Sequence, residues 1–155
     1  MNKVRVYQSI ALVIPFTFFA LLEGGLRFFD YGRDMPLFID YPQGENSTAP
    51  QYLLPRPEVV KRYFPEGSAA PSVTIETNFF LKNKPEDGLR IFVQGGSTAE
   101  GFPFGFGASI AGMLDYRLKQ SFPEKTVEVV NTALSAVNSY TILDFVDEII
   151  AQQPD

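Results

Sequence analysis

LRIFVQGGSTAE, residues 89–100, places an apolar, β-rich run directly before two glycines and a serine. A short apolar run that ends in a tight turn is typical of a buried strand. A helical pattern follows over residues 109–122, then a second β-rich run, TVEVVN, at 126–131, and a second helical pattern at 140–152. Strand, helix, strand, helix is the order of a parallel sheet with helices on its faces. The sequence therefore predicts an α/β fold.

Both helical patterns combine an apolar stripe with a capping residue. In the first, Ser109 is the expected N-cap, and the stripe consists of Ile110, Met113, Leu114, Leu118 and Phe122. In the second, Asn138 or Ser139 is the expected cap, and the stripe consists of Ile142, Leu143, Val146, Ile149 and Ile150. Two parallel strands rarely make a stable sheet alone, so we expect these residues to be the first part of a larger, truncated domain.

The composition excludes several classes of site. The chain has 155 residues, 45% of them hydrophobic, which is enough for a buried core, and its net charge is −5. A nucleic-acid partner is not expected, because such proteins need a basic face to neutralise phosphates. The chain contains no Cys and no His, so disulfides, thiolate ligands, imidazole ligands and a histidine base within these residues are excluded.

The N-terminus carries an uncharged run, VYQSIALVIPFTFFALL, at residues 6–22, preceded by Lys3 and Arg5. Its length is close to the minimum that spans a bilayer. We expect residues 1–29 to form a membrane anchor, with a cleaved signal peptide and a buried core helix as the alternatives. The basic flank predicts that the remainder lies outside the cytoplasm. Residues 30–88 contain eight of the twelve prolines, which predicts an extended linker with one short strand at 73–80. Residues 89–155 then form the α/β domain.

Ser97 stands where ligands bind in open α/β sheets, beyond the carboxyl end of a strand. The neighbouring glycines allow close approach of a substrate that a Cβ would block. A serine nucleophile is one interpretation, and it requires a base and donors for the oxyanion. A plain strand-to-helix turn, in which Ser97 caps backbone amides, is another. A phosphate-binding loop is a third, although no GK[ST] ending follows. The local pattern alone leaves all three open.

The segments RIFVQGGSTAEGFPF at 90–104 and VEVVNTALSAVNSYTILD at 127–144, with a terminal QQPD, resemble the membrane-anchored branch of the SGNH/GDSL hydrolase superfamily. The resemblance implies a three-layer α/β/α, flavodoxin-like parallel sheet. It assigns Ser97 as the nucleophile in the first family block. In the second block, N-x-G-x-x-G, Asn131 matches the first position, while Ala133 and Ala136 replace the glycines. Ala136 keeps the N–H that the family uses in its oxyanion hole, together with that of Ser97.

The resemblance also implies that the third family block and the catalytic Asp and His follow Asp155, so these 155 residues alone are expected to be inactive. The expected protein is a single-pass cell-membrane hydrolase or acyl transferase, with its globular part on the extracytoplasmic, or in bacteria periplasmic, side. Its partners would be the lipid bilayer and an ester or an acylated glycan, and its chemistry requires no cofactor or metal. The alternative is a non-catalytic, membrane-tethered binding or assembly module that retains the fold.

Three further groups of residues have two interpretations each. The aromatic segment FPFGF at 102–106 lines an acyl pocket or belongs to the core. Asn138 points to the site or caps the last helix, and the capping role is favoured. Asp144, Asp147 and Glu148 are expected to be solvated carboxylates rather than metal ligands.

Overall fold

The computed structural model describes residues 3–29, 35–42, 48–64 and 78–155. It divides into two compact units, Met1–Asp34 and Met35–Asp155.

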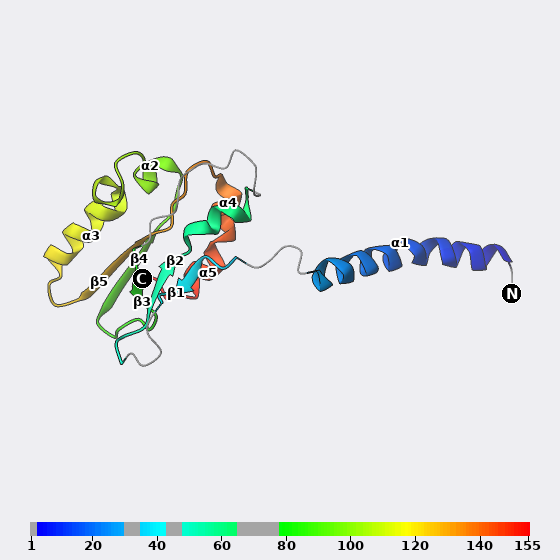
Figure 1. Cartoon of the computed structure of the whole chain (residues 1–155), viewed down its shortest axis with the longest axis horizontal. Helices are drawn as coiled ribbons and strands as arrows, with labels where there is room; N and C mark the ends of the chain where they lie inside the picture. Colours follow the sequence, from blue (N-terminus) through cyan, green and yellow to red (C-terminus); the bar gives the residue numbers. More distant parts are fainter. Residues whose placement is uncertain (1–2, 30–34, 43–47, 65–77) are drawn as a thin grey trace. The chain divides into compact units, whose positions relative to one another are not determined.

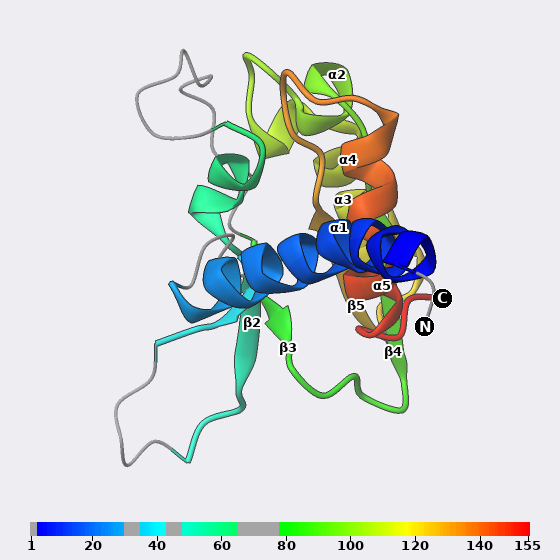
Figure 2. The same ribbon diagram turned by 90° about the vertical axis from the view of Figure 1, so that its right-hand side faces the viewer.

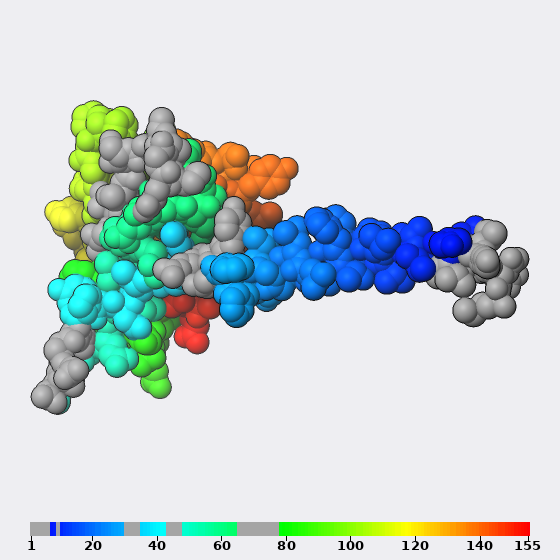
Figure 3. Space-filling view, turned by 45° about the vertical axis from the view of Figure 1, so that its right-hand side comes forward, coloured from blue at the N-terminus to red at the C-terminus, as the bar shows by residue number. Residues whose placement is uncertain are grey.

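The first unit consists of one long helix, α1 (Lys3–Phe28). Ile10–Phe28 is long and apolar enough to cross a membrane, and none of this span is buried. Figure 3 shows its side chains (blue) standing out along the visible face of the helix. A salt bridge of 2.7 Å between Arg27 and Glu23 lies near its C-terminal end. Length and composition fit the expected anchor, and a signal sequence would pass the same test.

The second unit contains two small sheets and several helices (Figure 1). Its strands are β1 (Phe38–Asp40), β2 (Tyr52–Pro55), β3 (Phe80–Leu81), β4 (Gly88–Val93) and β5 (Thr126–Asn131). Its α-helices are α2 (Ser97–Glu100), α3 (Ile110–Ser121), α4 (Ser139–Asp144) and α5 (Val146–Ile150), and its 3-10 helices are η1 (Pro57–Arg62) and η2 (Phe106–Ala108).

The parallel pair predicted from the sequence is confirmed. β4 and β5 run parallel in a two-stranded sheet, with Gly88 opposite Thr126 and Val93 opposite Asn131. Because parallel strands have their carboxyl ends at one edge, the segments that follow Val93 and Asn131 meet there. Figures 1 and 2 place α2 and α4, which follow these strands, at the same end of the sheet.

Helix α3 covers one face of this sheet. Alternate residues of both strands point toward α3 because side chains along a strand alternate between faces. This cluster consists of Leu89, Ile91, Val93, Phe106, Ala111, Leu114, Leu118, Val127 and Val129. The expected N-cap is confirmed: the Ser109 hydroxyl accepts from the Gly112 N–H at 3.0 Å. The predicted stripe is only partly correct, since Ile110 and Met113 are exposed while Ala111 is buried.

The opposite face is covered by α4, α5 and the described residues 35–42 and 48–64, which we call the strap. The strap forms β1, β2 and η1, and β1–β2–β3 is an antiparallel sheet. The larger core lies here and consists of Leu37, Phe38, Leu53, Val59, Val60, Phe80, Val130, Leu134, Phe145 and Ile149. The rings of Phe38, Phe80 and Phe92 meet edge to face, with centroids 5.3–5.7 Å apart. The prolines of this region thus border short strands instead of forming a free linker.

The strand expected at 73–80 and the helix expected at 140–152 both differ from the structure. The strand predicted at 73–80 lies largely outside the described residues, and only β3 is seen at its end. The single helix predicted at 140–152 is divided into α4 and α5. Its buried stripe is Thr141, Phe145 and Ile149, whereas Leu143 and Ile150, which were expected inside, are 68% and 60% exposed.

A buried ion pair joins the two parallel strands. Arg90 and Glu128 lie opposite each other in the register, and the Arg90 Nη2 and Glu128 Oε2 atoms are 2.8 Å apart. The Arg90 side chain is 1% exposed and lies over the Phe80 ring at 4.9 Å. It also donates to the carbonyl oxygens of Leu81 and Gln152. These partners satisfy a charge that would otherwise be costly to bury.

One side chain bonds two backbone groups at the outer edge of β5. The Asn78 carboxamide accepts from the Asn131 N–H at 3.3 Å and donates to the Val129 carbonyl at 2.6 Å. At the outer edge of β4, Asp155 bonds both backbone groups of Arg90. The Asp155 N–H donates to the Arg90 carbonyl at 2.9 Å, and the Arg90 N–H donates to the Asp155 carboxylate at 2.8 Å.

Candidate active site

Ser97 is the first residue of α2, directly after the turn that leaves β4. Its side chain is exposed. The N–H of a residue at this helical position has no acceptor within the helix, so it is available to a ligand. Helix α2 ends after Glu100, where the N–H groups of Gly101 and Phe102 both donate to the Ser97 carbonyl at 3.1 Å.

Two glycines permit this turn. A Cβ at Gly95 would lie 2.5 Å from the Ala99 Cβ, so any larger residue would displace the helix that carries Ser97. Gly101 ends that helix with a φ of 98°, a left-handed conformation that favours glycine. A Cβ at Gly101 would lie 2.7 Å from the Ser109 Cβ. The glycine-rich sequence therefore fixes both ends of the helix.

Asn131 ties the Ser97 helix to the loop that follows β5. Its side chain is fully buried, and its amide nitrogen donates to the carbonyl oxygens of Ala99 at 3.3 Å and Glu100 at 3.2 Å. Its amide oxygen accepts from the Ala133 N–H at 3.1 Å. A further backbone bond joins the Leu134 N–H to the Gly95 oxygen at 3.0 Å. The two loops are thus held together at the carboxyl edge of the sheet.

Glu100 makes a second buried link between the same loops. Its carboxylate, 5% exposed, accepts a hydrogen bond from the Ser135 hydroxyl. Sequence reasoning missed this residue. A glutamate one helical turn after Ser97 is normally solvated, and nothing in the local pattern predicts a buried partner 35 residues later.

Ala136 lies in the loop between β5 and α4, and its φ is 60°. This left-handed conformation costs an alanine roughly 1–2 kcal/mol, and glycine adopts it freely. Ala136 is exposed, and no described residue accepts a hydrogen bond from its N–H. The methyl group of Ala133 is fully buried instead. The two alanines therefore differ in environment, and only Ala136 has a backbone conformation that favours glycine.

The Ser97 hydroxyl makes no hydrogen bond to any residue that the structure describes, so no base within these ranges activates it. Among the described residues, no group of three Asp or Glu side chains is arranged to hold a metal ion. The residues seen here provide an exposed hydroxyl and two N–H groups, and the proton acceptor that acyl transfer requires is not among them.

Beyond Ala136, a carboxylate network fixes the strap against α4 and α5. The Arg62 guanidinium contacts Asp144 at 2.9 Å and Glu148 at 2.7 Å, and the Tyr63 hydroxyl donates to Asp144 at 2.6 Å. The hydrogen bonds from Tyr63 and Arg62 hold the pKa of Asp144 below its usual range. Burial, reinforced by the bond to Asp144, raises the pKa of Tyr63 to about 12. Asp144 and Glu148, expected as solvated carboxylates, are therefore structural ion-pair partners.

The other candidate residues separate into distinct roles. Asn138 is the N-cap of α4, because its side chain accepts from the Tyr140 N–H at 3.0 Å. Phe102 and Phe104 are 61% and 79% exposed, which contradicts a core role for them, whereas Phe106 packs against the α3 cluster.

Comparisons of the chain with models of protein families, with curated proteins and with solved structures find no match.

Proposed function

We propose that the chain is the N-terminal part of a membrane-anchored serine ester hydrolase or acyl transferase of the SGNH/GDSL type. Ser97 is the nucleophile, and the N–H groups of Ser97 and Ala136 bind the oxyanion. The observation that carries the proposal is the pairing of two features at one sheet edge. An exposed serine begins a helix there, and a loop with a free N–H in a left-handed turn is bonded alongside it.

The geometry supports this role in three respects. Parallel strands bring Ser97 and Ala136 to the edge where α/β proteins bind ligands. Gly95 keeps a side chain out of the turn. Asn131 and Glu100 then hold the two loops in one arrangement, which is what donors for a developing charge require.

The chemistry needs a group from outside the sequence given. When the Ser97 hydroxyl attacks an ester carbonyl, its proton passes to a base; the oxyanion then collapses and expels the alkoxide, which takes that proton from the base and leaves as an alcohol. The sequence has no histidine, so we propose that the base belongs to a part of the protein beyond these residues. An acceptor hydroxyl or water then releases the acyl group. The complete domain would be a three-layer α/β/α sheet, held on the extracytoplasmic side by the N-terminal helix.

A fluorophosphonate probe tests the proposal on the native protein in its source membrane. The probe forms a bond between phosphorus and the serine oxygen and loses fluoride, and it reacts much faster with a serine that a base activates than with an ordinary serine. We expect peptide mass spectrometry to find the label on Ser97, to find none in Ser97→Ala, and to find normal labelling in Ser121→Ala, which alters another exposed serine. A folded wild-type protein that stays unlabelled would favour the rival function, a non-catalytic binding or assembly module.

A further inference from the structure

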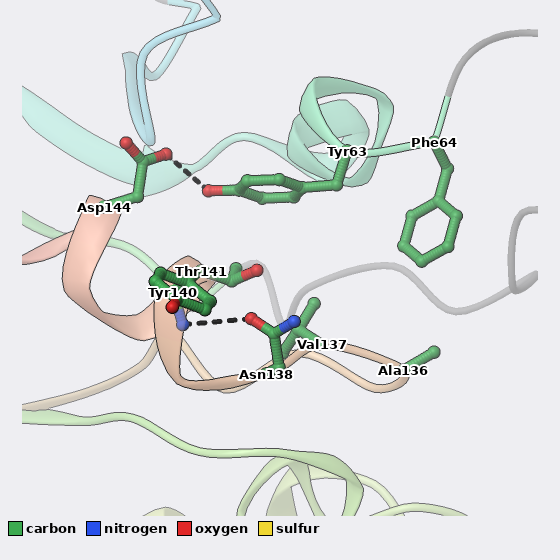
Figure 4. Close-up of a pocket in the computed structure, with 8 residues that line it drawn as sticks. All are labelled: Tyr63, Phe64, Ala136, Val137, Asn138, Tyr140, Thr141 and Asp144. Carbon is green, nitrogen blue, oxygen red and sulfur yellow. Dashed lines mark hydrogen bonds between the residues drawn. The ribbon is translucent and has the colours of Figure 1, made fainter.

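A pocket of about 480 Å³ lies beside Ala136, between the strap and α4 (Figure 4). Tyr63 and Phe64, which follow η1, form one side of it. Asn138, Tyr140 and Asp144, from the end of the β5–α4 loop and from α4, form the other. Its size falls within the range of small-molecule sites, about 300–1,000 Å³. Ala136 lines this pocket and also carries one of the N–H groups of the proposed oxyanion site, so the pocket adjoins that site.

The strap side of the pocket is rigidly held. The Arg62 guanidinium contacts Asp144 and Glu148, donates to the Met35 carbonyl through Nε at 3.1 Å, and lies over the Phe145 ring at 5.5 Å. The Tyr63 ring is fixed at its far end by the bond from its hydroxyl to Asp144 (Figure 4). A preformed wall of this kind lowers the entropy cost of binding a ligand.

The chemistry of the lining indicates what the pocket accepts. Three aromatic rings offer apolar faces, while Asn138 and Asp144 offer oxygen acceptors. Among the residues that the structure describes, no Lys or Arg lines the pocket. The Arg62 guanidinium behind it faces two carboxylates, so this cluster carries one positive and two negative charges, a sum of −1. An anionic ligand would be repelled, and the Asp144 charge is already bonded to Tyr63 and Arg62, which leaves little attraction for a cation.

We infer that this pocket binds a neutral carbohydrate ring. Such a ring has an apolar face that stacks on an aromatic side chain, and hydroxyls that donate to amide and carboxylate oxygens. The inference rests on the proposed function in one respect: the ring is the alcohol side of the ester, or the acyl acceptor, placed next to the Ala136 N–H. Tyr140 is then the residue that determines specificity, because its ring is 80% exposed and is available to stack on a ligand.

Binding is measured without turnover. The Ser97→Ala chain in detergent micelles is titrated with cellotetraose, maltotetraose and chitotetraose as neutral probes, tetragalacturonate as the anionic probe, and choline as the cationic probe. Saturation-transfer NMR gives the contacts and the affinities. We expect at least one neutral tetrasaccharide to bind, and we expect tetragalacturonate and choline to bind with affinities at least tenfold lower. We expect Tyr140→Ala to weaken binding about three- to tenfold, the size of one lost aromatic contact.

Tyr116→Ala is the matched control, because Tyr116 is also an exposed helical tyrosine, 64% exposed, but it lies on α3 and not in the pocket. Its affinities should equal those of the parent chain. The inference is overturned if no neutral sugar binds, if tetragalacturonate or choline binds as tightly, or if both tyrosine variants behave alike. If sugar binds but the fluorophosphonate does not label Ser97, the carbohydrate pocket is supported and the esterase proposal is rejected. If Ser97 is labelled but no sugar binds, the esterase proposal is supported and the carbohydrate pocket is rejected.

Discussion

The Ser135 hydroxyl donates a hydrogen bond to the Glu100 carboxylate, and both side chains are buried. The bond joins the helix that begins at Ser97 to the loop that contains Ala136. If Glu100 is replaced by Ala, the Ser135 hydroxyl loses its acceptor in a buried site, which costs about 1–3 kcal/mol of unfolding free energy. Urea unfolding of the detergent-solubilised chain measures this loss.

The Ser135→Ala variant should also destabilise, because it leaves the carboxylate without that donor. The double variant should cost less than the sum of the two, since both single changes break the same bond. Glu124→Ala, which alters an exposed glutamate, should change the unfolding free energy by less than about 0.5 kcal/mol. Additive effects at positions 100 and 135 would show that the bond does not couple the two loops.

Ala136 has a φ that suits glycine. We therefore expect Ala136→Gly to raise the unfolding free energy by about 1 kcal/mol, because it removes the steric cost of a Cβ in the left-handed region. Ala133→Gly is the matched control: this alanine is fully buried and has no positive φ, so the change should destabilise the fold by a similar amount. Thermal unfolding of both variants distinguishes the two positions. Equal destabilisation would contradict the assigned backbone conformation.

The Arg90–Glu128 pair is the most deeply buried ion pair among the described residues. Glu128→Gln leaves the guanidinium of Arg90 buried without its counter-charge, and we expect a loss of about 3–5 kcal/mol. The exposed pair of Lys82 and Asp40 offers the comparison, because Asp40→Asn should cost less than about 1 kcal/mol. Denaturant unfolding decides between them. A loss as small as that of the exposed pair would mean that water reaches Arg90.

The Asp144 carboxylate makes stability depend on pH. Hydrogen bonds from Tyr63 and Arg62 hold its pKa below the usual value, so its contribution is present above about pH 3.9, the unfolded value, and is lost as the pH falls through the folded pKa. Because the side chain is 51% exposed, we expect at most about 1 kcal/mol. Wild type should exceed Asp144→Asn in unfolding free energy at pH 7, and the difference should begin to shrink as the pH falls below about 4. A difference that is constant from pH 7 to pH 3 would exclude this role. Asp147→Asn, at an exposed position of α5, is the control.

Local signals predicted the parts of the fold that local forces determine. Ser109 and Asn138 were expected as caps because a short polar side chain before an apolar stripe satisfies free N–H groups, and both act as caps. The parallel pairing of β4 and β5 followed from the order of strands and helices. The helix stripes were less accurate, since exposed Leu143 and buried Phe145 have the same apolar character and only the packing partners separate them.

The contacts that depend on distant segments were not predictable from the sequence. Prolines around the strap indicated a linker, because a proline removes a backbone donor, but Phe38 and Leu53 pack against residues some ninety positions later. Arg62 and Asp144 look like surface charges in isolation. At the candidate site, the Ser97 turn was evident from its glycines, whereas the bonds made by Asn131 and Glu100 to that turn needed the structure.

Asn78 takes the position of a neighbouring strand at the end of β5. Its carboxamide presents one acceptor and one donor at the spacing of a peptide group, so it occupies the place on β5 where another strand would begin to pair. A single side chain thereby satisfies two backbone groups of β5, without the length of chain that a covering strand would require. Asp155 occupies the outer edge of β4 in the same way, so a strand from this polypeptide or another could pair at either of these positions only by displacing the residue that is bonded there.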